Sequence, residues 1–534
     1  MNFLYSNNFV KKNYLYYFIL FLYSFFFNFI VANRGISPID TLVHFDSSNR
    51  IILGEIPIRD FWVVHGILVD YLQVFFFKVF GLNWVAYVIH GSVFNVLITI
   101  LSFKLFIDFK IGNFHAFVIA FCISNLSYSL SGTPFLDFHS TFFSLFSIYL
   151  LSYSIKFNKP SYYFFVPFLF CLGFFSKQVP SAYIFLLISI LIFFYSLLLN
   201  NYKSILFYFF GCVFSLLLII LFLFFSRIDL LDFFYQYFLF PTSIAGSRYS
   251  DYNLNIKNVF LDYKFIYLLF FPIIFANLIK LKESFNYLKK ADFLLFLINF
   301  AFTISLIFHQ IYTKNQIFIY FLIPYLGFLL IYYLEKSNLN NKNFYNLIII
   351  ILCIFVTLKY GIRYDLKRRF HELEKVDLSK GIDAKNLDKK LSSLKWISPY
   401  YSNPEDELKN IKFFLDVLKV EENTYKYNRM IISEYSLVSV LLNHKLYSPS
   451  RTYDSISYPL INSSYHKIYQ NYFINNIKSN NIKVIYIFFI NGINDKDLNR
   501  LIFDYIDADC FIIKKYNYNI FRLLIKNNCN FKIN

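Results

Sequence analysis

Long apolar runs recur through roughly the first two thirds of the chain, most of them separated by short polar turns. A helix that crosses the hydrocarbon core of a bilayer needs about 20 mostly apolar residues. The pattern therefore predicts a polytopic α-helical membrane protein with about eleven transmembrane helices. We expect them near residues 14–32, 84–107, 114–131, 138–155, 161–176, 180–199, 205–226, 263–280, 292–309, 316–334 and 344–360.

The pattern changes after Tyr360, where the chain takes on the character of a soluble domain. Expected helices alternate there with short runs rich in β-branched and aromatic residues, which is typical of an α/β fold. The sequence thus predicts a membrane module over residues 1–360 and a small α/β domain over residues 361–534. In this domain helices are expected at 404–420, 464–479 and 495–506, and strands at 429–434, 484–490, 510–515 and 519–525.

The composition supports a membrane protein and argues against a nucleic-acid partner. Of the 534 residues, 57% are hydrophobic and only 16% are charged, whereas soluble domains average about 25% charged residues. The net charge of +18 does not require nucleic acid, because membrane proteins collect Lys and Arg in their cytoplasmic loops. The sequence contains no phosphate-binding loop, dinucleotide fingerprint, zinc spacing or nucleophile elbow. It therefore indicates no site for a soluble nucleotide in a Rossmann-like fold.

The distribution of Lys and Arg predicts which side of the membrane each loop faces. Lys11 and Lys12 precede the first span, and the turns expected on their side carry most of the other basic residues. The opposite short turns hold only Lys177 and Lys314, so the positive-inside rule places the N-terminus in the cytoplasm. We expect a multi-pass protein of the bacterial inner membrane, with the loop of residues 33–83 and the C-terminal domain on the periplasmic side.

The six cysteines are scattered without the spacing of a metal site. Cys510 and Cys529 could form a disulfide if the C-terminal domain is extracytoplasmic, because disulfides persist in oxidising compartments. The other four lie in apolar runs, where we expect them to pack as small hydrophobic residues. These four are Cys122, Cys171, Cys212 and Cys353.

The loop of residues 33–83 differs from the other connections because it carries nine ionisable residues among apolar ones. Unpaired charge is costly near a bilayer, so such a cluster is by default a functional hypothesis. Asp40 has two interpretations from the local sequence. Ser37 and Pro38 fit a helix start, where the dipole stabilises an acid without any catalysis; alternatively, Asp40 carries chemistry. His44 would share the face of Asp40 if one helix continued. The nine residues are Asp40, His44, Asp46, Arg50, Glu55, Arg59, Asp60, His65 and Asp70.

Two segments of this loop carry a family resemblance. Residues 40–44 read DTLVH and residues 49–61 read NRIILGEIPIRDF. They resemble the first external loop of the GT-C superfamily of integral-membrane glycosyltransferases, which includes protein O-mannosyltransferases and lipid A aminoarabinose transferases. In that superfamily an acid just after the first span is followed by a helix, a Leu-Gly-x-x-Pro turn and an Arg-Asp or similar pair. Many relatives have an acidic pair at the first position, whereas Thr41 follows Asp40 here, which weakens the case for a metal there.

Later features agree with the resemblance in order, which extends over roughly the first 330 residues. Asp137 follows a Gly-Thr-Pro turn at the start of a span, and residues 173–177 read GFFSK, similar to the family's glycine-containing span that ends in Lys. The stretch 309–324 is similar to the family's late span and its Pro-containing polar turn. A periplasmic α/β domain at the C-terminus is common in the bacterial members.

The resemblance implies a reaction in which a sugar leaves a polyprenyl-phosphate donor and is transferred to an acceptor hydroxyl. A carboxylate is needed to orient and deprotonate this hydroxyl, and Asp40 is the candidate base. The departing lipid phosphate needs a cation in a site of low dielectric constant, and Lys177 is the candidate. Asp137 is a second candidate acid that orients the acceptor or binds a metal. The alternative interpretations are a helix-start acid for Asp137 and a snorkelling side chain for Lys177.

Further residues are candidates for substrate binding. His44, Arg248 and His309 could contact the donor or the acceptor, as could Lys314 in the late external turn. Arg59 either binds substrate or forms an internal ion pair with the neighbouring Asp60. His139 lies two residues after Asp137, but two ligands without a third are a weak metal signature. A divalent cation is thus a candidate cofactor for which the sequence supplies no complete ligand set.

Two other functions remain open from the sequence. A transporter or flippase for a lipid-linked glycan would usually show polar residues at mid-membrane and internal repeats, and neither is evident here. A non-catalytic protein of envelope biogenesis would use its external domain to bind a partner. For the glycosyltransferase hypothesis, the expected partners are membrane lipids, a polyprenyl-phosphate sugar and an acceptor that is a lipid, a glycan or a protein.

Overall fold

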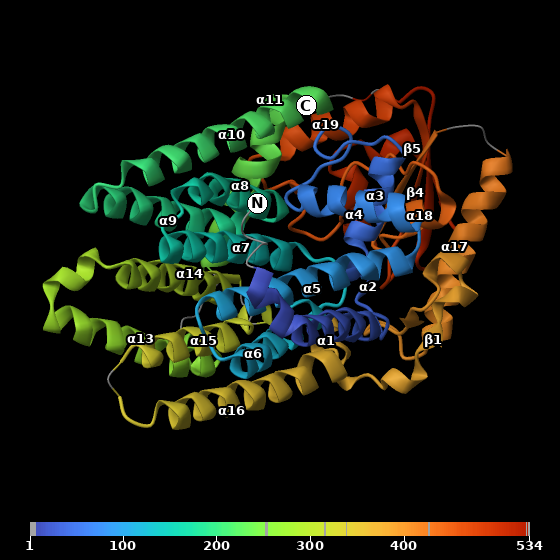
Figure 1. The fold of residues 1–534 in the computed structure, drawn as a ribbon. Coiled ribbons are helices and arrows are strands. Elements are labelled where there is room, and N and C mark those ends of the chain that lie inside the picture. Colours follow the sequence, from blue (N-terminus) through green and yellow to red (C-terminus); the bar gives the residue numbers. More distant parts are fainter. Residues whose placement is uncertain are drawn as a thin grey trace. The chain divides into compact units, whose positions relative to one another are not determined.

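The computed structural model describes residues 7–250, 255–313, 317–337, 339–424, 428–529 and 531 (Figure 1). The chain divides into two compact units. The first, called the helical unit, comprises Met1–Ala32, Val88–Ile220 and Asp251–Phe370. The second, called the mixed unit, comprises Asn33–Tyr87, Leu221–Ser250 and His371–Asn534. The loop that carries Asp40 thus shares a compact unit with the C-terminal domain, whereas the sequence suggested one boundary after residue 360.

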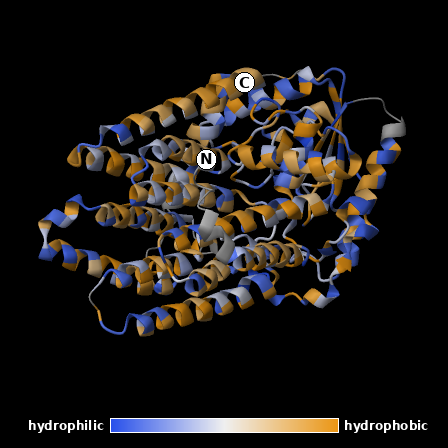
Figure 2. Cartoon of the chain, in the orientation of Figure 1, coloured by the Kyte–Doolittle hydropathy of each residue, from blue (hydrophilic) through white to orange (hydrophobic). Residues whose placement is uncertain are grey.

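The helical unit consists of the helices expected from the apolar runs. Within the described residues, seven helices are long and apolar enough to cross a membrane, and their ribbons are mostly hydrophobic in Figure 2. The chain is therefore a polytopic α-helical membrane protein, and the count of eleven spans remains a prediction. The helices found at the eleven expected positions are α1 (Asn7–Ala32), α5 (Trp84–Asp108), α6 (Asn113–Asn125), α7 (Leu136–Phe157), α8 (Phe165–Ser176), α9 (Gln178–Leu198), α10 (Tyr202–Ser226), α13 (Lys264–Glu283), α14 (Ala291–Thr313), α15 (Leu322–Glu335) and α16 (Lys342–Gly361).

The mixed unit is built on a four-stranded sheet with the order β3-β4-β6-β5. β3 (Asn428–Ser433) and β4 (Ile482–Phe488) are parallel, and β6 (Ile520–Ile525) is antiparallel to both β4 and β5 (Phe511–Lys515). The four expected strands and the expected α/β character are therefore confirmed. The other elements of this segment are α17 (Pro404–Thr424), α18 (Val438–Leu442), α19 (His466–Ser479), α20 (Asp495–Leu498) and a two-stranded ribbon of β1 (Ile382–Asp383) and β2 (Lys395–Trp396).

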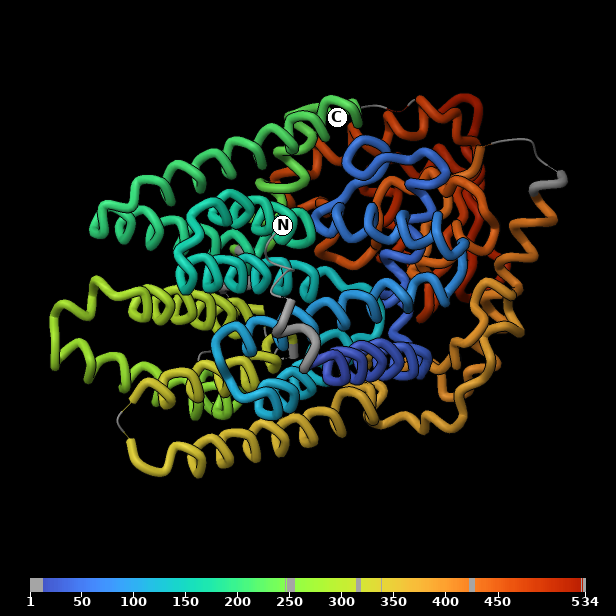
Figure 3. The backbone as a smooth tube through the Cα atoms, in the orientation of Figure 1, coloured from blue at the N-terminus to red at the C-terminus, as the bar shows by residue number. Residues whose placement is uncertain are grey.

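Residues 33–87 pack into the mixed unit as three helices, α2 (Pro38–Thr41), α3 (Val43–Ile52) and α4 (Ile67–Phe80). Figure 3 shows this blue segment beside the orange and red C-terminal part of the same unit. Trp62 is buried in the core formed by the sheet and α19, together with Phe240 of α12 (Phe240–Ser250). The backbone of Trp62 also bonds to the C-terminal segment: its N–H donates to Pro449 O at 2.9 Å. The loop is therefore part of the fold of the mixed unit.

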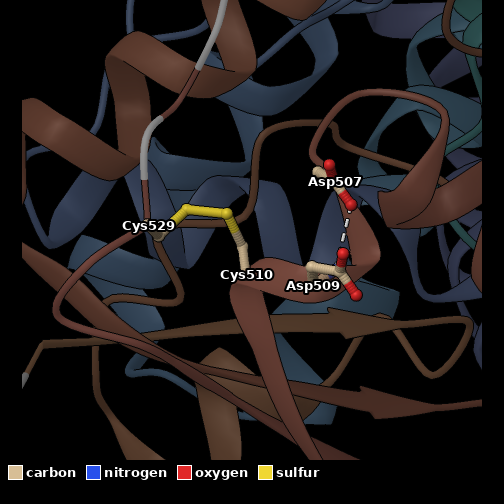
Figure 4. Close-up of a disulfide and its surroundings, with 4 residues drawn as sticks. All are labelled: Asp507, Asp509, Cys510 and Cys529. Atoms are coloured by element: carbon tan, nitrogen blue, oxygen red, sulfur yellow. Dashed lines mark hydrogen bonds between the residues drawn. A yellow bond between two sulfur atoms is a disulfide. The ribbon is translucent and has the colours of Figure 1, made fainter.

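The two cysteines of the C-terminal segment form a disulfide. Cys510, at the start of β5, is joined to Cys529, which follows β6 (Figure 4). Next to the disulfide, the backbone N–H of Asp509 donates a hydrogen bond to Asp507 Oδ1 at 3.0 Å. The four other cysteines are free and lie in helices of the helical unit.

Candidate functional site

Three of the residues expected on the external side meet in the helical unit. Lys177 Nζ lies 2.6 Å from Asp137 Oδ1, and His309 Nε2 lies 3.5 Å from the same oxygen. The side chain of His309 is 1% exposed, that of Asp137 7%, and that of Lys177 18%. We call these three residues the Asp–Lys–His cluster. In this cluster one carboxylate contacts two basic groups, and the lysine side chain is the most exposed of the three.

Each member of the cluster comes from a helix end. Asp137 lies in the first turn of α7, where the helix dipole stabilises a carboxylate. Lys177 has extended backbone angles (φ −159°, ψ 134°) between the end of α8 and the start of α9. His309 lies in the last turns of α14. The side chains therefore converge where three helices end, which is a common way to build a polar site within an apolar bundle.

Close packing of α7 against the α8–α9 turn fixes the position of Lys177. Ser140 Oγ of α7 donates to the backbone carbonyl of Lys177 at 2.9 Å, and it also bonds Ser181 Oγ of α9 at 2.9 Å. A Cβ atom on Gly173 would lie 3.1 Å from the carbonyl oxygen of Ser140. Glycine is thus required for this helix contact, which explains the small residue in the GFFSK run.

The expected pair of Asp137 and His139 does not form a metal site. His139 Nε2 lies 3.0 Å from His90 Nε2, and its Nδ1 bonds the hydroxyl of Tyr128. Both ring nitrogens of His139 are therefore engaged away from Asp137. Among the described residues, no group of three or more His, Cys, Asp or Glu side chains is arranged to hold a metal ion.

Asp40 lies in the mixed unit, on the four-residue helix α2. Pro38 occupies the first helical position as expected, but Ser37 makes no side-chain capping bond. Instead, Ser37 N–H lies 3.1 Å from Thr41 Oγ1. The side chain of Asp40 is exposed. Burial raises the pKa of Tyr400, and the charge of Asp40 also raises it.

His44 does not share a face with Asp40, because α2 ends at Thr41 and α3 begins only at Val43. Its side chain is buried, with Nδ1 2.7 Å from Asp70 Oδ1. The other oxygen of Asp70 lies 3.2 Å from Arg451 Nη1. Burial lowers the pKa of His44, although Asp70 opposes this shift. The direct contacts of His44 are thus internal to the mixed unit.

The remaining candidates for substrate binding are Arg59, Arg248 and Lys314. Arg59 pairs with Asp60, at 2.7 Å between Nη2 and Oδ2, which confirms the internal ion pair. Arg248 lies on α12, but its side chain is outside the described residues. Lys314 also lies outside the described residues.

The sequence did not predict the partners of Arg50, Glu55 and Asp70 in the loop. Arg50 pairs with Glu55, and its Nη1 and Nη2 donate to the carbonyls of Ser450 and Ser448 at 3.3 and 2.7 Å. Arg451 binds Asp70. A Leu-Gly-x-x-Pro turn followed by Arg-Asp predicts a structured loop, but not a partner that is hundreds of residues away. These contacts explain why the loop carries so many charges.

No family model matches the chain, and no curated protein matches it.

Proposed function

We propose that the protein is a GT-C-type glycosyltransferase that moves a sugar from a polyprenyl-phosphate donor to an acceptor hydroxyl at the outer face of the membrane. The observation that carries the proposal is the Asp–Lys–His cluster. Within the described residues, Lys177 Nζ makes one hydrogen bond, to Asp137, although an ammonium group has three donors. It therefore retains donors for a phosphate, and the half-enclosed site strengthens such a charge interaction.

In this proposal the acceptor oxygen attacks the anomeric carbon as the bond from that carbon to the phosphate oxygen breaks. Asp40 accepts the hydroxyl proton, and the polyprenyl phosphate leaves with the bonding electron pair, so that the anomeric configuration is inverted. Lys177 and His309 stabilise the charge on the leaving phosphate. Asp137 holds Lys177 in place and compensates its charge while no phosphate is bound. The chain's own residues supply the base and the cations of this step.

The test is turnover by the purified protein with a panel of polyprenyl-phosphate sugars and candidate acceptors. Release of free polyprenyl phosphate, lost in Asp40→Asn and in Lys177→Ala, is the expected result. Lys336→Ala is the matched control, because Lys336 also pairs with an aspartate, Asp292, in the helical unit (2.5 Å) but has no assigned role. Full turnover by Asp40→Asn would disprove the assignment of the base. Movement of the lipid across proteoliposomes without any change in covalent structure would instead indicate a flippase.

A further inference from the structure

A cavity of about 260 Å³ lies among the ends of four helices of the helical unit. The end of α7, the end of α9 and the starts of α10 and α14 line it, together with the turns beside them. These elements meet at one end of the unit (Figure 1). The turns after α7 and α13 carry lysines, and the positive-inside rule places them on the cytoplasmic side. Because Lys159 and Lys289 line the cavity, we call it the two-lysine cavity.

The two-lysine cavity carries positive charge that no lining residue compensates. Among the described residues that line it, none is acidic. Neither Lys159 nor Lys289 makes a side-chain hydrogen bond or an ion pair with the described part of the chain. Asp292, which lies close to Lys289 in the sequence, is paired with Lys336 instead. Two ammonium groups with three donors each favour an anion that accepts several hydrogen bonds, such as a phosphate ester.

Backbone contacts hold both lysines at the cavity. Lys159 N–H donates to the carbonyl of Ser154 at 2.9 Å, which closes the turn after α7. The hydroxyl of Tyr195 on α9 contacts the carbonyl oxygens on both sides of Lys289, and its distance to that of Lys290 is 3.2 Å. The backbone that carries the two ammonium groups is therefore fixed in place. A site on fixed backbone binds its ligand with a smaller ordering cost.

The surface beside the cavity is apolar. Leu199 lines the cavity and is 38% exposed. Leu198 and Phe194, near the same end of α9, are 48% and 64% exposed. Both α9 and α10 are long and apolar enough to cross a membrane, so these side chains face lipid acyl chains. A soluble anion would use only the lysines, whereas a ligand with an anionic head and acyl chains would contact both surfaces.

We propose that the two-lysine cavity binds the phosphate headgroup of an anionic phospholipid from the cytoplasmic leaflet. Basic pockets between membrane-spanning helices on this side of a membrane suit such headgroups, because the leaflet there is rich in anionic lipids. Lys159 and Lys289 contact the phosphate, and the exposed apolar residues of α9 contact the acyl chains. The proposal does not depend on the glycosyltransferase function, since it concerns the opposite expected face of the membrane.

Native mass spectrometry of the full-length protein in a non-ionic detergent tests this proposal. The probes are dioleoyl phosphatidylglycerol, dioleoyl phosphatidylcholine and glycerol 3-phosphate, the last as a free phosphate ester. Phosphatidylglycerol should bind more tightly than the zwitterionic lipid, and glycerol 3-phosphate should not displace it. Lys159→Gln/Lys289→Gln should weaken the binding of phosphatidylglycerol roughly thirtyfold, which is about 2 kcal/mol. Lys159→Arg/Lys289→Arg keeps the charge and should retain binding, which separates lost charge from a folding defect.

The matched control is Lys203→Gln/Lys282→Gln. It removes the same charge from two exposed lysines that do not line the cavity, and it should bind phosphatidylglycerol like the wild type. Equal losses in the two glutamine variants would show a general attraction to the surface and overturn the site. Equal binding of the two lipids, no lipid binding, or displacement by glycerol 3-phosphate would each overturn the assignment of an anionic phospholipid.

Discussion

Two cations, Arg50 in the mixed unit and Lys177 in the helical unit, differ in how many of their hydrogen-bond donors are engaged. In the mixed unit, all three guanidinium nitrogens of Arg50 are engaged, by Glu55 and two backbone carbonyls, and its plane lies over the ring of Phe61 at 4.0 Å. In the helical unit, the ammonium group of Lys177 makes a single hydrogen bond to the part of the chain that the structure describes, to Asp137. A saturated cation stabilises the fold, whereas a cation with unused donors can accept a ligand. Burial alone does not distinguish a cation that stabilises the fold from one that can bind a ligand. The number of its hydrogen-bond donors that are not engaged within the protein is the property that we use to distinguish them.

The largest effect is expected from Arg50→Ala. Removing this guanidinium leaves Glu55 buried without its cation, which typically costs about 3–5 kcal/mol. The loss is measured by chemical unfolding of the detergent-solubilised protein, with a signal that reports on the mixed unit. Lys409→Ala breaks an exposed ion pair with Asp406 and serves as the control, with an expected change below about 1 kcal/mol. Equal stabilities of the two variants would contradict the structural role of Arg50.

Lys177→Ala should instead lose activity, with a smaller loss of stability than Arg50→Ala, because Asp137 keeps its contact with His309 (3.5 Å). Loss of a group that stabilises charge in the transition state lowers the rate by roughly 10²–10³-fold, or about 2.7–4 kcal/mol. The measurement is kcat for release of polyprenyl phosphate, together with the unfolding temperature. If Lys177→Ala unfolded like Arg50→Ala, both cations would be structural, and the comparison between the units would fail.

Reduction of the disulfide should destabilise the mixed unit selectively. Cys510 and Cys529 are separated by 19 positions, and closing a loop of this size contributes about 3 kcal/mol in the chain-entropy model. Treatment with a reductant should lower the unfolding temperature of the wild type but not that of Cys510→Ser/Cys529→Ser. Alkylation of both thiols in intact, unreduced cells would disprove the pairing and its oxidising compartment.

The smallest effect concerns the pH dependence of stability. Burial raises the pKa of Asp46 from 3.8 to about 6, against the opposing influence of Arg50 and Ser439. Between these values the folded state holds a proton that the unfolded state releases, so this contribution to stability falls as the pH rises to about 6. Asp46→Asn keeps an oxygen for the N–H of Ser439 (3.0 Å) and removes the titration. Relative to the wild type, the variant should gain roughly 2 kcal/mol between pH 4 and pH 7. A constant difference in stability across this range would show that Asp46 is ionised throughout.

Part of the candidate site could be predicted because it depends on topology and local sequence. The apolar runs and the bias of Lys and Arg placed Asp137, Lys177 and His309 on one side of the membrane, and the structure brings the three side chains together. The expectation that His44 and Asp40 share one helix face was wrong, because α2 ends before Leu42 and α3 begins after it. A periodicity argument holds only while one helix continues.

The sequence by itself determined the apolar helices, the strands of the C-terminal segment and the charge asymmetry of the loops, because hydrophobic periodicity and span length act over short distances along the chain. Only the tertiary structure decided that the loop of residues 33–83 belongs to the mixed unit. That choice depends on buried pairs such as Asp70 with Arg451, 381 positions apart. Partners at such separations are set by the packing of whole elements, and no local pattern encodes them. Tertiary packing also decided that all three guanidinium nitrogens of Arg50 are engaged, whereas Lys177 lies half-buried against Asp137.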